Sequence, residues 1–380
     1  MAYIPFHKPH LPNTTYPAIK KVLNSGWLTT GPRVTIFEDR FKEIVKSKQA
    51  IAVSSCTAAL HLAYLANKFG PGDEVIVPSY TFVSTINTIM HTGAKPVFCE
   101  IDESTLCANP TDLEKRITKK TKGIVIVHFA GMPTDMDSIN NLAKKYNLAV
   151  IEDAAHAFMT KYKGKYIGES NNTICFSFYA TKNLTTLEGG MITTNNKKIA
   201  GFSRIMSLHG ISKDAWKRYN KEGSWKYDVI APGYKYNMTD VQAVIGIEQL
   251  KHVGESVKKR QYLASLYKKR LENNPNIILP IDPPYPNSQH AWHLFTIRLT
   301  EKSKVSRNRL IELLKEHEIG TSVHFIPNHL QTYYRRLMGN SVRLPVTEKV
   351  FDTIISLPFF EDLTDFQVEK ICQTINELTI

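Results

Sequence analysis

Cysteine is scarce in this sequence and forms no cluster. The chain of 380 residues has five cysteines, an odd number, spread from Cys56 to Cys372 without a Cys-x-x-Cys pair. This distribution argues against a disulfide framework or a cysteine metal site, and it is typical of proteins kept in a reducing compartment. We therefore expect a cytoplasmic protein without a bound metal ion.

Long apolar runs are also missing from the sequence. None approaches the roughly 20 residues that a membrane-spanning helix needs, and residues 1–8 lack the charged and then apolar pattern of a secretory signal. The sequence has no internal repeats and no low-complexity tracts. It thus predicts a globular protein with no membrane span, and its length predicts two lobes rather than one.

Acidic residues are too few to balance the basic ones. Aspartate and glutamate number 35 against 48 lysines and arginines, which gives a formal net charge of +13. Such a charge is expected of a protein that binds nucleic acid, an acidic membrane surface or a polyanionic small substrate. The basic residues are dispersed, and the densest groups, at 258–260 and 268–270, are typical of a solvated helix face. With no RNA-binding aromatic signature and no zinc finger in the sequence, we expect a small polyanionic substrate and no nucleic-acid partner.

β-Rich and helical segments alternate from about residue 50 to residue 195. The apolar runs favour strands that are buried on both faces of a parallel sheet, with crossover helices at 57–68 and 135–146. The predicted strands are residues 50–53, 74–77, 96–98, 124–127, 148–151 and 174–178. This half of the chain therefore predicts an α/β domain with a mostly parallel sheet.

The C-terminal part predicts a second, smaller α/β domain. Thr239 and Gln242 form a capping-box pattern at the start of a helix over 239–251, and Thr364 begins a similar pattern near the end of the chain. Between them the patterns predict helices at 254–272 and 306–317 and strands at 291–299 and 322–325. We expect a large domain over 13–252 and a small one over 253–380, with residues 1–12 packed near the small one.

Polar residues follow several of the predicted strands, and ligands of open α/β sheets bind at the carboxyl ends of strands. At residues 53–60 a strand is followed at once by Ser54, Ser55, Cys56 and Thr57 and then by a helix. Free N–H groups at a helix start bind anions such as phosphate. An ordinary serine or threonine helix cap is the alternative interpretation.

A second strand end carries Glu152, Asp153 and His156. An aspartate in a low-dielectric site can keep a pyridinium nitrogen protonated through a charge-assisted hydrogen bond, which makes the ring an electron sink. A helix-capping aspartate with a core-facing histidine is the alternative. A metal pair of Asp153 and His156 has no evident third ligand in the sequence.

A third segment, residues 177–191, places Lys182 between an apolar strand and a loop of small and hydroxylated residues. A lysine with a lowered pKa can form an imine with an aldehyde. Most lysines lie at the surface, so the buried strand before Lys182 and the Glu-Gly-Gly after it distinguish this one. Ser177 is placed to share the phosphate site. Together the three segments predict a site for pyridoxal phosphate (PLP), with a phosphate cup, an aspartate for the ring nitrogen and a lysine for the aldehyde.

Over nearly its whole length the sequence resembles the DegT/DnrJ/EryC1/StrS family of sugar aminotransferases. The Glu-Asp-Ala-Ala-His element at 152–156 and the Ser-x4-Lys element at 177–182 are its most specific marks. The similar segments are residues 4–6, 25–32, 54–60, 78–82, 127–135, 151–157, 177–190, 233–237, 290–293 and 323–325. The resemblance implies the fold-type I architecture of PLP-dependent enzymes, as in aspartate aminotransferase.

The resemblance implies a cofactor role for each matching residue. Lys182 is expected to bind the aldehyde and to move a proton during catalysis, and Asp153 to pair with the pyridine nitrogen. His156 and Phe82 would lie against the ring. The phosphate would be held by Cys56, Thr57 and Ser177.

The resemblance also implies a homodimer with shared active sites, in which Asn237 reaches the phosphate of the partner subunit. The segments that line the sugar-nucleotide pocket in the family contain Trp27, Thr29, His324 and Phe325. Three residues depart from the family pattern. Cys56 stands where many members have Gly. Phe82 and Tyr179 stand where the closest relatives have Trp and His, respectively.

Within the family, residues 233–237 and 290–295 are most similar to the 4-aminotransferases of UDP-4-keto sugars, in particular the UDP-4-amino-4-deoxy-L-arabinose synthases. The implied reaction moves the amino group of L-glutamate to the C4 ketone of a nucleotide-linked sugar and releases 2-oxoglutarate, for surface glycan or lipid A (lipopolysaccharide) biosynthesis. The alternatives are a 3-keto sugar, a dTDP- or GDP-linked sugar, or a PLP-dependent sugar dehydratase. The dehydratases of the family carry histidine at the position of Lys182. A non-catalytic binding protein is a further alternative. Such a protein would not need Asp153 and Lys182, and the sequence retains both.

Overall fold

The computed structural model describes residues 3–212, 226–339 and 341–380. Within these residues one large sheet has seven strands in the order β1-β9-β8-β5-β4-β2-β3. In chain order the strands are β1 (Gln49–Val53), β2 (Glu74–Pro78), β3 (Lys95–Cys99), β4 (Thr121–Val127), β5 (Ala149–Asp153), β8 (Thr173–Ser177) and β9 (Gly190–Thr194). β9 is antiparallel to its two neighbours, and the remaining pairs are parallel. The predicted α/β class and mostly parallel sheet are confirmed.

The six strands predicted for this sheet are all present, with small differences at their ends. The sequence prediction missed β9, which it treated as part of a loop. Gly190 and the threonines that end the strand have the composition of a loop, yet every residue of β9 is buried because the strand lies between β1 and β8. Tertiary pairing therefore overrides the weak local preference of this segment.

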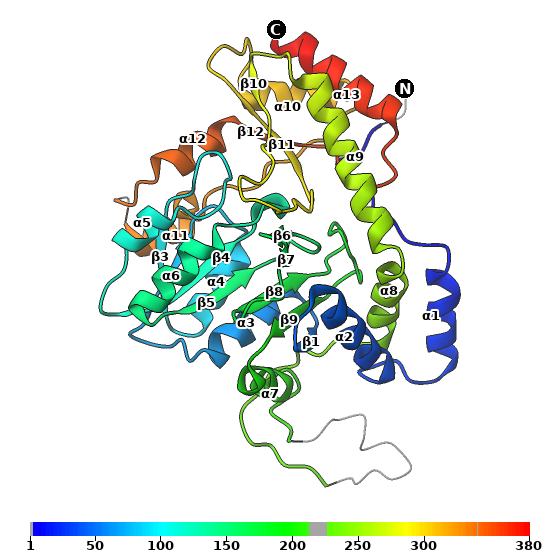
Figure 1. Cartoon of the computed structure of the whole chain (residues 1–380), viewed down its shortest axis with the longest axis vertical. Coiled ribbons are helices and arrows are strands. Elements are labelled where there is room, and N and C mark those ends of the chain that lie inside the picture. The colour runs from blue at the N-terminus through cyan, green and yellow to red at the C-terminus, as the bar shows by residue number, and fades with distance from the viewer. Residues whose placement is uncertain (1–2, 213–225, 340) are drawn as a thin grey trace.

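Helices cover both faces of the large sheet (Figure 1). Alternate strand residues point to opposite faces, so that Phe176 packs with one helical layer and Cys175 with the other. The first layer contains α2 (Pro32–Val45), α6 (Met136–Tyr146) and α8 (Asp240–Leu250). The second contains α3 (Cys56–Ala66), α4 (Val83–His91) and α7 (Lys197–Met206). The predicted helices at 57–68, 135–146 and 239–251 correspond to α3, α6 and α8, and Thr239 and Gln242 form the predicted capping box.

A smaller antiparallel sheet, in the order β10-β11-β12, lies in the C-terminal part of the chain. Its strands are β10 (Ile277–Ile278), β11 (Phe295–Leu299) and β12 (Ile354–Leu357), and its core is shared with α9 (Val253–Leu271), α10 (Arg307–Glu316) and α13 (Asp365–Thr379). The long helix α9 runs from the end of α8 to α13 in Figure 1. Ile4 joins this core and donates its N–H to Glu318 O at 2.8 Å. The domain bounds 13–252 and 253–380 stay a prediction, because Tyr334 and Leu344 pack in a core of the large sheet.

Shorter elements complete the described fold. They are α1 (Thr15–Asn24), which packs on α8, the helices α5 (Pro110–Lys115), α11 (Thr332–Met338) and α12 (Pro345–Thr353), and the hairpin β6 (Lys161–Tyr162) and β7 (Lys165–Tyr166).

Two strand predictions in the small domain need correction. Residues 322–325 form no strand; Ser322 makes a single bridge to Ser356, and the segment then turns toward the large domain. The sequence prediction missed β12, which pairs with β11 and is wholly buried. The strand predicted over 291–299 begins only at Phe295, because the preceding residues bond to Ala130 and Gly131 of the large domain.

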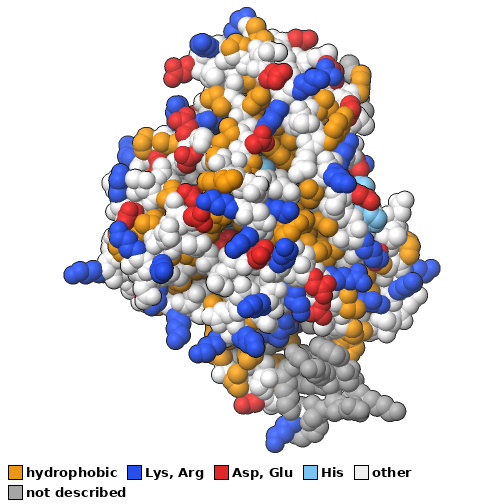
Figure 2. Space-filling model, viewed as in Figure 1, with side chains coloured by type: hydrophobic (Ala, Val, Ile, Leu, Met, Phe, Trp, Pro, Cys, Tyr) orange, Lys and Arg blue, Asp and Glu red, His pale blue; other side chains and the backbone are white. Residues whose placement is uncertain are grey.

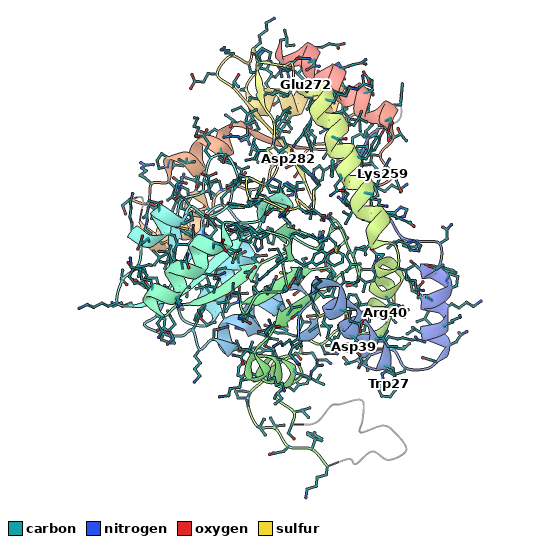
Figure 3. All side chains as sticks on the ribbon, in the orientation of Figure 1. Trp27, Asp39, Arg40, Lys259, Glu272 and Asp282 are labelled. Carbon is teal, nitrogen blue, oxygen red and sulfur yellow. The ribbon has the colours of Figure 1, made fainter. Side chains whose placement is uncertain are left out.

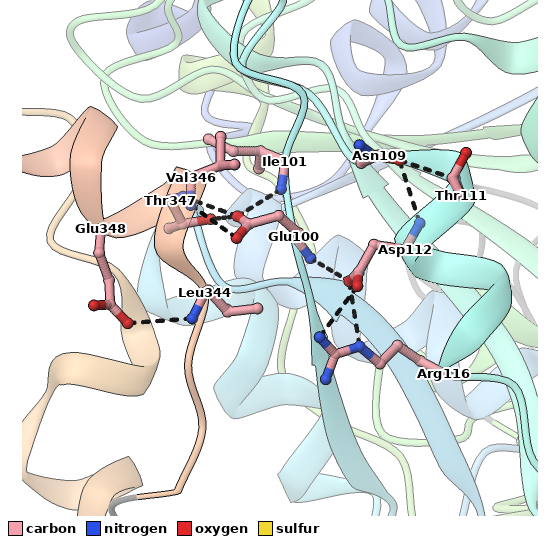
Figure 4. Close-up of polar contacts among 10 residues, drawn as sticks. All are labelled: Glu100, Ile101, Asn109, Thr111, Asp112, Arg116, Leu344, Val346, Thr347 and Glu348. Carbon is pink, nitrogen blue, oxygen red and sulfur yellow. Dashed lines mark hydrogen bonds and ion pairs between the residues drawn. The ribbon is translucent and has the colours of Figure 1, made fainter.

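A buried carboxylate joins the end of β3 to the start of α12 (Figure 4). Glu100 accepts hydrogen bonds from the backbone N–H of Thr347 at 2.8 Å and of Val346 at 3.0 Å, and from the Thr347 hydroxyl. Its own N–H donates to Asp112 at 2.8 Å. A negative charge at a helix start also interacts favourably with the helix dipole. Glu100 thus anchors C-terminal residues to the edge of the large sheet.

Replacing Glu100 with alanine is expected to lower the free energy of unfolding by about 2–3 kcal/mol, since buried N–H groups lose their acceptor. Urea denaturation of the purified protein measures the change. The matched control is Glu103→Ala, which removes a carboxylate 41% exposed that pairs with Arg298 and Lys349; it should cost less than about 1 kcal/mol. Equal effects of the two substitutions would contradict the anchoring role of Glu100.

Basic side chains are spread over the face shown in Figure 2, with acidic side chains among them. This arrangement agrees with the dispersed lysines and arginines of the sequence. In the part of the chain that the structure describes, no helix is both long and apolar enough to cross a membrane.

Candidate active site

A cavity of about 450 Å³ opens at the carboxyl ends of β1, β5 and β8. It brings together nine of the predicted site residues: Cys56, Thr57, Phe82, Asp153, His156, Ser177, Lys182, His324 and Phe325. Phe82 comes from the start of α4, and His324 and Phe325 come from the small domain. Segments that are far apart in the sequence therefore meet where open α/β sheets bind their ligands.

The start of α3 forms one wall of the cavity. Ser55 caps this helix by accepting a hydrogen bond from the Ala58 N–H at 3.1 Å. The N–H groups of Cys56 and Thr57, at the first helical positions, have no intrahelical partner and are available to an anion. The Ser177 hydroxyl lines the same cavity. This wall fits the phosphate of PLP, as the sequence predicts.

Gly190 lets β9 pass close behind this wall. A Cβ atom added there would lie 2.5 Å from the carbonyl carbon and oxygen of Ser55 and 2.6 Å from the Cys56 nitrogen. Carbon atoms cannot approach backbone atoms so closely, so the helix start would have to move. The glycine is needed for the geometry of the phosphate wall and not for an unusual backbone angle.

Gly190→Ala is therefore expected to weaken PLP binding by about tenfold or more, since overpacking at such a contact costs about 1–3 kcal/mol. Titration of the cofactor-free protein with PLP, followed by fluorescence, measures the dissociation constant. Gly201→Ala is the matched control, because a Cβ atom at Gly201 meets nothing within 4 Å. Unchanged affinity in a correctly folded Gly190→Ala protein would place the phosphate elsewhere.

Asp153 ends β5 inside the cavity and is only 4% exposed. Its carboxylate accepts hydrogen bonds from the Thr85 hydroxyl at 2.7 Å and from the Ala155 N–H at 3.1 Å. Burial raises the pKa of Asp153, and those hydrogen bonds work against the rise. Among the described residues it has no ion-pair partner, so a ligand N–H with positive charge would complete its environment. The ring nitrogen of PLP is such a group.

The neighbouring Glu152 points to the opposite face of the sheet. It accepts hydrogen bonds from His128 Nε2 at 2.9 Å and from Ser170 and Asn172, and the glutamate and the histidine are both buried. The sequence places two carboxylates side by side after this strand. Strand alternation assigns one of them to the cavity and the other to a structural network.

Lys182 reaches the cavity from the turn after β8. Burial lowers the pKa of its amine to about 8. A larger fraction of this amine is neutral near neutral pH than in an ordinary lysine, and the neutral amine is the form that attacks an aldehyde. Burial thus gives Lys182 the lowered pKa that imine formation with an aldehyde requires.

Aromatic rings line the wall beside Lys182. The His156 ring is stacked with Phe325 at 5.8 Å between centroids, and its Nδ1 accepts the Ala130 N–H at 3.2 Å. Burial holds the pKa of His156 well below its usual value, so the ring is neutral. Phe82 is 57% exposed and lies 6.0 Å from the Phe325 ring. The planar groups fit a flat heteroaromatic ligand.

Trp27, Thr29 and Asn237 do not line this cavity. They meet instead around Thr30, since Trp27 Nε1 donates to Thr30 O at 3.1 Å and Asn237 Nδ2 donates to the Thr30 hydroxyl at 2.7 Å. Thr29 O accepts the Asp240 N–H at 3.1 Å. Figure 3 shows Trp27 at the turn between α1 and α2. We call Trp27, Thr29 and Asn237 the Thr30 cluster; their predicted ligand contacts remain predictions.

Sequence reasoning assigned no role to several residues that contact the site. Thr85, one helical turn after Phe82, binds Asp153, and its spacing on α4 could have indicated this. His293 lies 3.5 Å from the Lys182 amine and also contacts Asn183. His293 belongs to a segment that resembles the family, but its contact with Lys182 spans 111 positions in the chain and has no local signal.

In the described ranges, no group of three or more histidine, cysteine or acidic side chains could hold a metal ion.

The family of the chain follows from its similarity to known proteins. A sequence profile described as the DegT/DnrJ/EryC1/StrS aminotransferase family matches residues 10–376. The chain belongs to this family. It is 44% identical to the spore coat polysaccharide biosynthesis protein SpsC of Bacillus subtilis over 379 residues, which cover 99% of this chain and 97% of SpsC. A protein of Methanocaldococcus jannaschii, MJ1066, is 45% identical over the same length, covering 99% of this chain and 98% of MJ1066.

Solved structures agree with this assignment. The putative sugar aminotransferase Spr1654 of Streptococcus pneumoniae, in its PMP form, superposes with a TM-score of 0.92 at 32% identity, covering 99% of this chain and 98% of that one. PseC of Helicobacter pylori, an aminotransferase involved in the biosynthesis of pseudoaminic acid, has a TM-score of 0.92 at 28% identity and covers 99% of both chains. Spr1654 has also been solved in a PLP form. The chain is therefore a PLP-dependent aminotransferase of the sugar aminotransferase family, and its phosphate wall, Asp153 and Lys182 fit that cofactor.

Proposed function

We propose that the enzyme transfers the amino group of L-glutamate to a nucleotide-linked keto sugar, most specifically to the C4 ketone of a UDP-4-keto sugar. The observation that carries the transfer is the meeting of Lys182, Asp153 and the α3 start in one cavity. The sugar class is supported by the family and by SpsC and PseC, whose names refer to polysaccharide and pseudoaminic acid biosynthesis. The similarity of residues 233–237 and 290–295 to UDP-4-keto sugar aminotransferases supports the finer assignment. The products would be a 4-amino sugar nucleotide, for surface glycan or lipid A biosynthesis, and 2-oxoglutarate.

The residues of the cavity divide the work as follows. When bound, PLP supplies an aldehyde and an electron sink for negative charge at the carbon that carries the amino group. Lys182 would bind the aldehyde carbon and later move a proton to or from the substrate carbon through its neutral amine. Asp153 would accept the ring N–H, and Cys56, Thr57 and Ser177 would hold the phosphate. His156, Phe82 and Phe325 would orient the ring and exclude water from one side.

A half-reaction identifies the sugar. The enzyme is loaded with pyridoxamine phosphate, and UDP-, dTDP- and GDP-linked 4-keto and 3-keto sugars are added one at a time. The substrate is the sugar that restores the visible absorbance of the lysine-bound cofactor at the lowest concentration. Response to a UDP-4-keto sugar alone supports the finer proposal, and preference for a 3-keto, dTDP or GDP sugar replaces it. Loss of a hydroxyl from the sugar without amino transfer would indicate a dehydratase, which the presence of Lys182 disfavours.

We also propose a homodimer in which each active site is completed by the partner subunit. The Thr30 cluster lies outside the cavity of its own chain, and Asn237 lines a separate hollow of about 280 Å³. A residue that binds the cofactor phosphate from there would have to serve a second copy.

The free, buried cysteines support a cytoplasmic location.

Mixing two inactive variants tests the shared site. Lys182→Ala and Asn237→Ala are unfolded together and refolded as a mixture, and activity is measured on the mixture and on each variant alone. In a mixed dimer with shared sites, one site carries both substitutions and the other carries neither, so activity should return to roughly a quarter of wild type or less, as random pairing and one intact site per mixed dimer predict. No recovery, with mixed dimers shown by mass spectrometry, would contradict shared sites.

A further inference from the structure

The amine of Lys182 faces a buried histidine that the proposed reaction does not use. His293 is 4% exposed, and its Nε2 atom lies 3.5 Å from Lys182 Nζ. Its other ring nitrogen, Nδ1, lies 3.1 Å from Asn183 Oδ1. Lys182 and Asn183 belong to the large domain and His293 to the C-terminal segment, so the contact joins the two parts of the chain.

Hydrogen bonds define which nitrogen of His293 carries the proton. Asn183 Nδ2 donates to Ala291 O at 2.9 Å, and this bond turns the amide so that its oxygen faces His293. An amide oxygen only accepts, so His293 Nδ1 must donate its N–H to it. Nε2 of the neutral ring then has a lone pair directed at Lys182. The ring presents an acceptor to the amine.

The backbone around His293 is held in place on both sides. The His293 N–H donates to Ala130 O at 2.8 Å, and the buried Arg260 donates to Trp292 O at 3.1 Å. The imidazole is also in contact with the His156 ring, with 4.3 Å between centroids. These contacts hold the backbone and the ring of His293 beside Lys182.

We infer that His293 is a positioning residue for Lys182: its Nε2 accepts an N–H of the lysine amine, and Asn183 holds the histidine in the tautomer that can do so. An amine that donates one N–H to His293 directs its lone pair away from the imidazole, into the cavity. The inference rests on the proposed role of Lys182 as the residue that binds the aldehyde. A chain of hydrogen bonds from Ala291 through Asn183 and His293 would thus direct the lone pair of this amine into the cavity.

Several ionisable groups face Lys182. From the packed elements around it these groups are Cys56 of α3, Asp153 of β5 and the imidazoles of His7, His156, His293 and His324; Tyr179 and Glu188 line the same cavity. Burial lowers the pKa of His7 and His324 to about 4 and that of His293 well below its usual value. Burial raises the pKa of Cys56 well above its usual value. The named histidines and Cys56 therefore leave the region around pH 8 to Lys182.

The experiment measures the pKa of the Lys182 amine without using turnover. Full-length protein freed of cofactor is mixed with PLP from pH 6 to pH 10, and the initial rate of growth of the visible band is recorded. Borohydride trapping and mass spectrometry identify the lysine that reacts. Because PLP itself is the same probe throughout, its own titration cancels when variants are compared with wild type.

The wild-type midpoint is expected at about pH 8. His293→Phe removes an acceptor that stabilises the ammonium form more than the neutral form, so the midpoint should fall by about one pH unit. His293→Gln places an amide oxygen near the Nε2 position and should keep the midpoint within about 0.3 of wild type. Asn183→Leu removes the amide oxygen that keeps the proton on Nδ1 of His293, so the proton can move to Nε2. An Nε2–H repels the ammonium form of Lys182, and the midpoint should therefore shift in the same direction as in His293→Phe.

A matched control is His290→Phe, which replaces another buried histidine, stacked on Trp292, and should leave the midpoint unchanged. An unchanged midpoint in His293→Phe, or an equal fall in His293→Gln, would overturn the positioning role. If wild-type protein forms no adduct at Lys182, the proposed function fails instead. An adduct at Lys182 with the same midpoint in every variant would exclude a positioning role for His293 and Asn183 and leave the role of Lys182 intact.

Discussion

Lys182→Ala should abolish turnover and remove the visible band of the lysine-bound cofactor. The substitution removes both the amine that binds the aldehyde and the base that moves the proton, so turnover should fall by about 10⁴-fold or more. The cavity keeps its phosphate wall and Asp153, and PLP should still bind without a covalent bond. Absorbance spectra and amino transfer to the sugar identified by the half-reaction measure the two effects.

The control for this variant is Lys163→Ala, which removes a lysine 43% exposed that pairs with Asp137 on the surface. Its spectrum and turnover should match those of wild type. Lys182→Arg is a second comparison, because it restores a positive charge but not a nucleophilic amine. Turnover near the wild-type rate in either substitution of Lys182 would show that another residue binds the cofactor.

Asp153→Asn should lower kcat by about 10²- to 10³-fold, the range expected when a preorganised charge is removed from a water-excluded site. The amide retains the shape of the side chain and can still accept from Thr85. It cannot balance a positive ring nitrogen, so PLP binding should also weaken. Steady-state kinetics and a PLP titration of the cofactor-free protein provide the two measurements.

Glu152→Gln is a stringent control for Asp153, because the two carboxylates are adjacent in sequence and both are buried. Glu152→Gln weakens the buried hydrogen bond to His128 and should lower the free energy of unfolding by about 1–3 kcal/mol, while the folded fraction retains its turnover. A loss of kcat in Glu152→Gln as large as in Asp153→Asn would mean that the strand end, and not one carboxylate, supports catalysis. Turnover of Asp153→Asn within about threefold of wild type would contradict the role of Asp153.

Much of the cofactor site was predictable because its parts are short and continuous in sequence. A strand, a turn and a helix start occupy adjacent residues, so Cys56, Asp153 and Lys182 could each be located from local patterns of apolar and polar residues. Parallel strands place their carboxyl ends at one edge of the sheet, and this rule brings the three segments together before any coordinates are known. The predicted strands of the large sheet and the capping box at Thr239 are confirmed for the same reason.

Other features depended on contacts that no local pattern encodes. β9 is a strand only because it lies between β1 and β8, and residues 322–325 are not one because the segment makes a single bridge to β12 and then lines the cavity. The placement of Trp27 and Asn237 away from the cavity could not be predicted, since it depends on how α1, α2 and α8 pack around Thr30.

The sequence by itself determined the family, the cofactor and the lysine that would bind it. These depend on short runs of residues whose chemistry is readable without the fold. Only the tertiary structure decided that Glu152 binds His128 on the opposite face of the sheet, and that His293 lies beside Lys182. Both outcomes come from burial, because the free energy gained by packing the sheet determines which face each side chain occupies and which distant groups become neighbours.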